Sequence, residues 1–104
     1  MSLHIETEHA GKVASVTVKG DVTIQTSPEL RSALQPLFSS GVEMIRVVLS
    51  DVKFMDSSGI ATLVEGLQWS KTSGGRFVLS GLSETVRDVF ELAKLDTIFE
   101  IEGQ

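Results

Sequence analysis

The sequence predicts an α/β fold: a mostly parallel sheet of about five strands, with an antiparallel first strand and with helices packed mainly on one face. The chain opens with two short alternating segments separated by a Gly-Lys turn, which indicates an antiparallel pair of strands. After that pair, helical patterns alternate with β-branched runs, and this alternation is typical of parallel strands joined by helices. Because such crossovers are right-handed, helices that join neighbouring strands fall on the same face of the sheet.

The first two strands are expected at residues 3–9 and 13–18. Residues 3–9 alternate between apolar or hydroxyl side chains and charged ones, the pattern of a half-exposed edge strand. Gly11 and Lys12 form the turn to the second strand. His4 and His9 are the only histidines, and on an edge strand we interpret both as solvated side chains rather than ligands or bases.

The first helix is expected after residues 20–23, which we interpret as a break in the second strand. Thr26 or Ser27 would cap this helix, and Pro28 suits its first turn. Pro36 lies inside the apolar stripe and must either kink the helix or limit it to about two turns. The stripe itself comprises Leu30, Ala33, Leu34, Leu37 and Phe38.

The middle of the chain predicts a strand at 44–49, a loop at 50–53 and a helix from Ser57 to about Thr72. The strand is nearly continuous and β-branched, as expected where both faces of a sheet are covered. Trp69 falls outside the helix's apolar stripe, so it either marks a contact surface or flanks the core. The stripe comprises Ile60, Leu63, Val64 and Leu67.

The C-terminal third predicts a strand at 76–79, a third helix and a terminal strand at 98–101. Ser73, Gly74 and Gly75 would end the preceding helix. The turn at 81–84 would cap the third helix, whose apolar stripe comprises Val86, Val89, Phe90 and Ala93.

Composition excludes several classes of function. The formal net charge of −5, with nine scattered Lys and Arg residues, argues against nucleic acid as a partner and favours a protein. The absence of cysteine removes disulfides, thiolate catalysis and cysteine-based metal sites. We expect one domain spanning 1–104, located in the cytoplasm and not inserted in a membrane, because neither a signal peptide nor a spanning apolar run is present.

The segment 54–60, Phe-Met-Asp-Ser-Ser-Gly-Ile, is the candidate functional site. Asp56 is suited to cap the helix that follows, where backbone N–H groups lack intrahelical partners. The hydroxyls of Ser57 and Ser58 would then lie at the positive end of the helix dipole, where negative charge is favoured. From the residues alone, this segment is either a phosphate-accepting switch or an ordinary capped helix.

Enzymatic chemistry is not expected at these serines. A serine nucleophile needs a base, and both histidines lie on the predicted edge strand, away from the motif. The chain has no Gly-x-Ser-x-Gly, Walker or Gly-x-Gly-x-x-Gly motif. Asp51 with Asp56 is too small a set for a metal site. We therefore expect no catalytic residue, metal ligand or cofactor.

The motif and its flanks resemble the STAS domain family, in particular the stand-alone bacterial anti-sigma-factor antagonists. The resemblance covers nearly the whole chain. It includes the approach at 47–52, Gly74-Gly75 after the motif helix, and the segments 86–90 and 95–99. Gly20-Asp21-Val22 resembles the opening of the family's first helix. The family's fold agrees with the element order expected above.

This resemblance implies that Ser57 is the phosphate acceptor of a partner-switching protein. In the family, the unphosphorylated antagonist binds an anti-sigma factor that is also a serine kinase and so frees the sigma factor. Phosphorylation blocks that binding and a serine phosphatase restores it. The residues expected to meet the partner are Asp21, Thr23, Asp56, Ser58 and Gly59.

One position departs from the family pattern, and one alternative function stays open. Many antagonists have an aspartate where this chain has Thr23, which reduces the acidic surface offered to the kinase. Ser58 and Gly59 would let the partner's backbone or ATP phosphates approach closely. The alternative is a STAS subunit that docks constitutively on the ATPase of a lipid-transport ABC complex.

Overall fold

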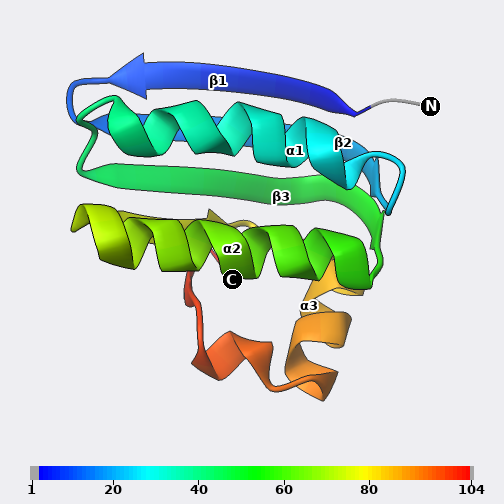
Figure 1. The fold of residues 1–104 in the computed structure, drawn as a ribbon. Helices are drawn as coiled ribbons and strands as arrows, with labels where there is room; N and C mark the ends of the chain where they lie inside the picture. The colour runs from blue at the N-terminus through cyan, green and yellow to red at the C-terminus, as the bar shows by residue number, and fades with distance from the viewer. Residues whose placement is uncertain (1–2, 104) are drawn as a thin grey trace.

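A computed structural model describes residues 3–103 of the chain (Figure 1). Its strands are β1 (His4–Ala10), β2 (Val13–Val22), β3 (Met44–Met55), β4 (Arg76–Ser80) and β5 (Glu100–Glu102). Its α-helices are α1 (Ser27–Leu34), α2 (Ser57–Ser73) and α3 (Glu84–Leu92). Two short 3₁₀ helices, η1 (Gln35–Ser39) and η2 (Leu95–Thr97), follow α1 and α3.

The strands form one sheet in the order β1-β2-β3-β4-β5. β1 is antiparallel to β2, and every other neighbouring pair is parallel. The predicted fold class is therefore confirmed, because each strand lies beside the strand that precedes it in the sequence.

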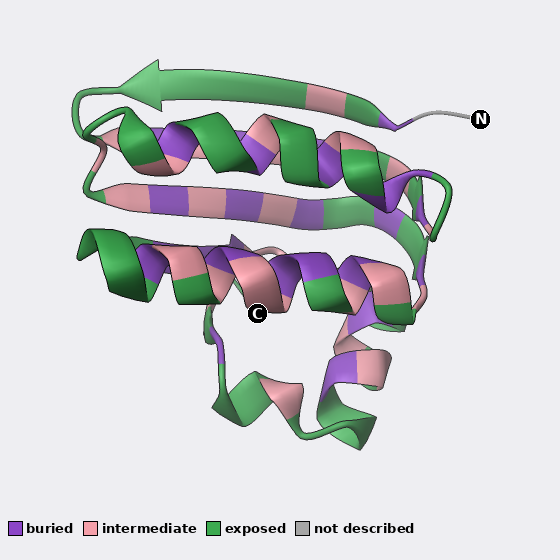
Figure 2. Ribbon diagram, viewed as in Figure 1, coloured by how far each residue is buried: buried purple, intermediate pink, exposed green. Residues whose placement is uncertain are grey.

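One face of this sheet holds the hydrophobic core. Alternate residues of β2 and β3 point to it, and Figure 2 shows this alternation along β3 as buried and half-buried residues in turn. The same cluster takes in residues of all three helices. The helices therefore share a face, as expected from right-handed crossovers. Its fully buried members include Val16, Val47, Leu30, Leu63 and Phe90.

The opposite face of the sheet carries charged side chains, so the prediction that the strand at 44–49 is covered on both faces was wrong. Arg46 on β3 pairs with Glu102 on β5 at 3.0 Å, and this ion pair passes over β4. Arg76 pairs with Glu100, whose pKa its hydrogen bond holds below the usual range. Val78, aligned with Arg46 and Glu100 in the sheet, is fully buried. The apolar stems of the arginines can shield a strand in this way.

β2 and β3 are longer than expected, which corrects two predictions. Gly20 does not break β2, because it adopts φ +115° within an irregular stretch of pairing, after which Asp21 and Val22 align with Phe54 and Met55. Residues 50–53 are not a loop, because β3 runs through them to Met55. Gly20-Asp21-Val22 therefore ends a strand, and α1 begins only at Ser27.

The helices agree more closely with the sequence. Pro36 limits α1 to Ser27–Leu34, about two turns, and the chain continues as the 3₁₀ helix η1. Trp69 flanks the core, where its ring meets that of Phe38 edge to face at 5.4 Å. The terminal strand is shorter and later than expected, at Glu100–Glu102, because the N–H groups of Ile98 and Phe99 donate back to the carbonyl of Leu95 in η2.

Candidate functional site

The candidate site lies where β3 ends and α2 begins. Asp56 is the N-cap of α2, with extended backbone angles. Its Oδ1 accepts hydrogen bonds from the backbone N–H groups of Ser58, at 2.8 Å, and Gly59, at 3.3 Å. The cap expected from the sequence is confirmed, and two of the free N–H groups at the helix start are satisfied.

The second carboxylate oxygen of Asp56 binds a distant part of the chain. Its Oδ2 accepts from the backbone N–H of Ile24 at 3.1 Å, and the N–H of Asp56 donates to the carbonyl of Val22 at 3.0 Å. One aspartate therefore joins the start of α2 to the loop between β2 and α1, and places residues 21–25 beside the two serines.

That loop is fixed by its own hydrogen bonds. Thr23 donates its N–H to Oγ1 of Thr26 at 2.8 Å, and that hydroxyl donates to the carbonyl of Asp21 at 2.7 Å. Oγ1 of Thr23 accepts from the N–H of Gln25 at 3.2 Å. Thr23, the position that departs from the family pattern, thus has a local structural role that an uncharged hydroxyl fulfils.

The three residues after Asp56 differ in exposure. Ser57, the first residue of α2, is exposed, and Ser58 is half-buried. Gly59 is buried, and a Cβ built on it would lie 2.7 Å from Cγ1 of Val22 and 2.6 Å from Cγ of Met55. The sequence suggested that Gly59 leaves room for a partner; the close approach in the structure is instead that of the chain's own strands.

The structure brings most of the predicted site residues together. Asp21 is exposed at the end of β2 and aligned with Phe54, which lies two residues before Asp56. Thr23, Asp56, Ser57 and Ser58 follow on the two segments that Asp56 joins. Contact between these residues and a partner stays a prediction.

Two apolar residues at this site were missed by the sequence reasoning. Ile24 is 73% exposed and Phe54 is 49% exposed. The only signal was the position of each: Ile24 stands alone in the polar segment 23–27, and Phe54 begins the motif but fits no buried stripe. Neither pattern distinguishes an exposed side chain from one that reaches the core.

Neither histidine is placed to act as a base for Ser57. His4 hydrogen bonds to Glu6 at 2.9 Å on the edge strand, a contact that lowers the pKa of Glu6, and two strand spacings separate β1 from β3. His9 aligns with Ala14, near the start of β2, whereas the site adjoins the end of β2. Among residues 3–103, no three His, Asp or Glu side chains gather closely enough to hold a metal ion.

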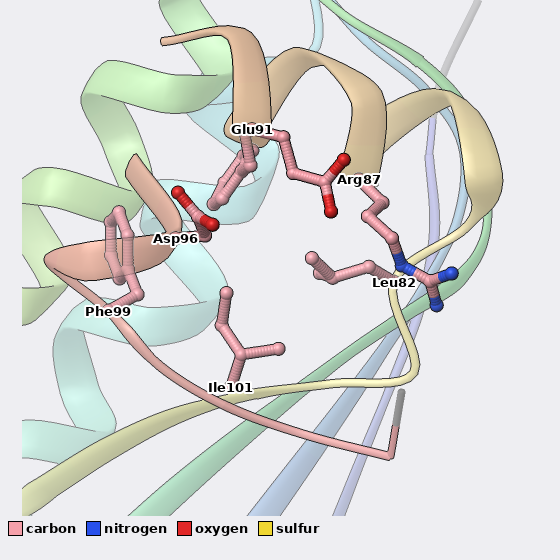
Figure 3. Close-up of a pocket in the computed structure, with 7 residues that line it drawn as sticks. Leu82, Arg87, Glu91, Asp96, Phe99 and Ile101 are labelled. Atoms are coloured by element: carbon pink, nitrogen blue, oxygen red, sulfur yellow. The ribbon is translucent and has the colours of Figure 1, made fainter. Parts of the chain in front are cut away.

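A cavity of about 330 Å³ lies elsewhere, between α3, η2 and β5 (Figure 3). Its walls include apolar side chains and three charged ones, Arg87, Glu91 and Asp96. Nε of Arg87 is buried and has no hydrogen-bond partner among residues 3–103. These elements carry none of the residues gathered around Ser57, and the mixed charges do not favour a ligand of one sign.

An α/β fold that displays a serine at the exposed start of a helix, beside the aspartate that caps it, has the form of a regulatory binding module. Within residues 3–103, no helix is long and apolar enough to cross a membrane.

Comparison with known proteins identifies the family. The STAS domain model matches residues 4–103, and the chain belongs to the STAS domain family. A protein of Staphylococcus aureus named anti-sigma-B factor antagonist is 31% identical over 101 residues, which is 97% of this chain and 94% of the relative. Its namesake in Bacillus subtilis is 29% identical over 104 residues, 100% of this chain and 94% of the relative.

A solved structure shares the fold. The Bacillus cell fate determinant SpoIIAA, in its phosphorylated form, matches with a TM-score of 0.75 at 19% identity over 97% of this chain and 93% of that one.

Proposed function

We propose that this chain is an anti-sigma-factor antagonist whose binding is switched by a phosphate on Ser57. The unphosphorylated form binds an anti-sigma factor that is also a serine kinase, and so releases the sigma factor in the cytoplasm. The observation that carries the proposal is the exposed position of Ser57 at the start of α2, in a chain whose relatives over nearly its whole length are named anti-sigma-B factor antagonists.

The geometry of Asp56 gives a physical reason for the switch. A phosphate on Ser57 adds about −1.5 to −2 charges. The N–H groups of Ser58 and Gly59, which would otherwise attract it, already donate to Asp56. These two N–H groups are therefore not free to bind the phosphate, and its charge stays at the surface, next to the carboxylate of Asp56. A partner that covers this surface would have to bury both charges, which is unfavourable unless both are paired.

We infer that Asp21, Thr23, Asp56 and Ser58 form the surface around the acceptor, supported from below by Gly59. In this scheme the chain is the substrate of a kinase and of a serine phosphatase, and performs no chemistry itself. It needs no metal or cofactor of its own, because ATP and the catalytic groups belong to the partner.

The test is phosphorylation by a purified anti-sigma-factor serine kinase of the same organism, with ATP and Mg²⁺, followed by mapping of the phosphate by mass spectrometry. We expect one phosphate, on Ser57, and none on Ser57→Ala. Ser58→Ala is the matched control and should still accept phosphate. A phosphate on another residue, or a chain that neither binds the kinase nor is phosphorylated, contradicts the proposal.

The same proteins distinguish the switch from constitutive docking on a transporter ATPase. Ser57→Asp places a carboxylate at the acceptor position and should weaken binding of the kinase strongly. A docking subunit should co-purify with a transporter ATPase and keep its affinity in Ser57→Asp. Retained affinity there would favour the docking function.

A further inference from the structure

Four large apolar side chains are exposed among the described residues: Ile24, Phe54, Leu92 and Ile98, with exposed fractions of 73%, 49%, 86% and 55%. Two of them, Ile24 and Phe54, belong to the two segments that Asp56 joins. The backbone of Ile24 is bound by Asp56, and Phe54 lies three residues before Ser57. Leu92 and Ile98 lie on the segment that includes the end of α3 and η2, away from the start of α2 (Figure 1).

Ile24 is exposed on a loop that is already ordered. The residue before it makes two hydrogen bonds with Thr26 and Gln25, and its own N–H donates to Asp56. The N–H groups of Thr26 and Ser27 also donate to the carbonyl of Thr23, at 3.0 and 2.7 Å. A partner that covers Ile24 therefore does not have to order the loop, which lowers the entropy cost of binding.

Phe54 is held equally firmly. It belongs to β3, is aligned with Asp21 of β2, and is followed by Met55, which is buried in the core. Its backbone is thus fixed by the sheet while about half of its side chain remains in solvent. A rigid aromatic side chain with accessible surface is the usual form of an interface anchor.

We propose that Ile24 and Phe54 are the apolar anchors by which the unphosphorylated chain binds its anti-sigma factor. The kinase must reach the hydroxyl of Ser57, so it covers the residues on either side of that serine. The carboxylates of Asp21 and Asp56 and one exposed cation, Lys53, lie next to the anchors in the chain or the sheet. The complementary surface of the kinase is therefore an apolar hollow whose rim carries more basic than acidic groups. This inference rests on the proposed function.

The anchors also explain why a phosphate at this position is effective. Burial of Ile24 and Phe54 removes water from the surface next to Ser57. A phosphate there would lose its hydration in an apolar contact, beside the carboxylate of Asp56, and both effects oppose binding. Because of this apolar contact, one added phosphate should greatly lower the affinity for the kinase.

The experiment measures the affinity of the same purified kinase for the wild type and for four single alanine variants by isothermal titration calorimetry. Ile24→Ala and Phe54→Ala should each raise the Kd by about tenfold to thirtyfold, the range of interface anchors. Leu92→Ala and Ile98→Ala are matched controls, because they remove exposed apolar surface elsewhere, and should leave the Kd within about twofold. Phe54→Leu, which keeps apolar area, should recover part of the affinity.

Each outcome has one interpretation. If the wild type binds the kinase and Ile24→Ala and Phe54→Ala bind it equally well, the proposal that these residues are anchors is wrong. The proposed phosphorylation switch is not affected by that result. An equal loss of affinity for the kinase in all four variants also contradicts the proposed anchors, because the loss would not be confined to the surface beside Ser57. If the wild-type chain neither binds the kinase nor accepts phosphate, both the proposed function and the proposed anchors are wrong. Thermal melting of every variant checks that the fold is unchanged.

Discussion

At the scale of single residues, Asp56 uses its two carboxylate oxygens for two different contacts. Oδ1 caps α2, and Oδ2 holds the N–H of Ile24, a residue 32 positions earlier in the chain. The start of the helix and the loop that borders it are therefore one mechanical unit. Any change at Asp56 alters both the helix cap and the surface beside the acceptor serine.

Gly59 determines how closely the start of α2 approaches the sheet, and Gly59→Ala should destabilise the protein. The added Cβ would lie 2.7 Å from Cγ1 of Val22 and 2.6 Å from Cγ of Met55. Met55 has a flexible side chain, but Val22 is β-branched and fully buried, so the helix must move. Overpacking of this kind costs about 1 to 3 kcal/mol of unfolding free energy. Urea denaturation monitored by circular dichroism measures it.

Ala61→Ser is the matched control for this substitution. Ala61 is exposed in the same part of α2. A small change there should alter the unfolding free energy by no more than about 0.5 kcal/mol. If Gly59→Ala were as stable as this control, the close packing of α2 against Val22 would be wrong.

The sequence could predict the cap but not its second contact. Asp-Ser-Ser-Gly before an apolar stripe is a local signal, and it correctly indicates an N-cap at Asp56. The bond from Ile24 depends on two segments meeting in space, and no pattern within either segment encodes that. The same limit concealed the role of Gly59, because the sequence does not show which strand residues lie beneath it.

At the scale of elements, β2 continues through a glycine that, in the sequence alone, predicts the end of a strand. Gly20 and the polar residues 50–53 look like chain breaks when each strand is considered alone. In the structure they face each other, since Lys19 and Gly20 align with Asp51 and Val52. The pairing continues because glycine accommodates the positive φ and the irregular register. This extension carries Asp21 and Phe54 to the edge of the site.

Arg31 of α1 joins the exposed sides of α1 and α2. The substitution Arg31→Gln tests this contact. Nε of Arg31 donates to Oε1 of Glu65 at 2.7 Å, and the guanidinium lies 5.4 Å from the ring centre of Trp69. The contacts with Glu65 raise the pKa of Arg31 above its usual value. Because the group is exposed, we expect only a small fall in Tm, at most about 4 °C. Trp69 is the only tryptophan, so its fluorescence emission should shift selectively.

Lys71→Gln provides the comparison, because it removes a cation from α2, the helix that carries Trp69. It should leave the emission maximum of Trp69 unchanged. Arg31→Lys should fall between the two, since an ammonium keeps the charge but not the planar contact with the ring. An unaltered emission spectrum in Arg31→Gln would show that the guanidinium does not cover Trp69 in solution.

At the scale of the whole molecule, the topology was the most predictable feature. Alternation of strand and helix patterns, with right-handed crossovers, places the helices on one face when each strand lies beside the strand that precedes it. The charged rear face was not predicted, because a run such as 44–49 reads as buried on both sides. Arg46 in that run belongs to an ion pair with Glu102, 56 residues later, and such a partner cannot be read from either segment.

The final prediction concerns the stability of the phosphorylated chain, which should differ little from that of the unmodified one. A phosphate at the first position of α2 gains about 0.3 to 1 kcal/mol from the helix dipole. Repulsion by the carboxylate of Asp56, which lies next to it, is of similar size for each unit of phosphate charge, about 1 kcal/mol at 4 Å in water. The two effects offset each other. Differential scanning calorimetry of the kinase-treated and untreated protein should show Tm values within about 5 °C.

Asp56→Asn separates the two effects. Its amide oxygen can still cap α2, whereas the amide nitrogen cannot accept from the N–H of Ile24, a loss that is the same with and without phosphate. The charge that repels the phosphate is gone, so phosphorylation of this variant should raise its Tm relative to the unmodified variant. A fall of more than about 10 °C in the phosphorylated wild type would instead mean that phosphate disrupts the fold. The switch would then act through local unfolding of the site, and not through added charge on a surface that stays folded.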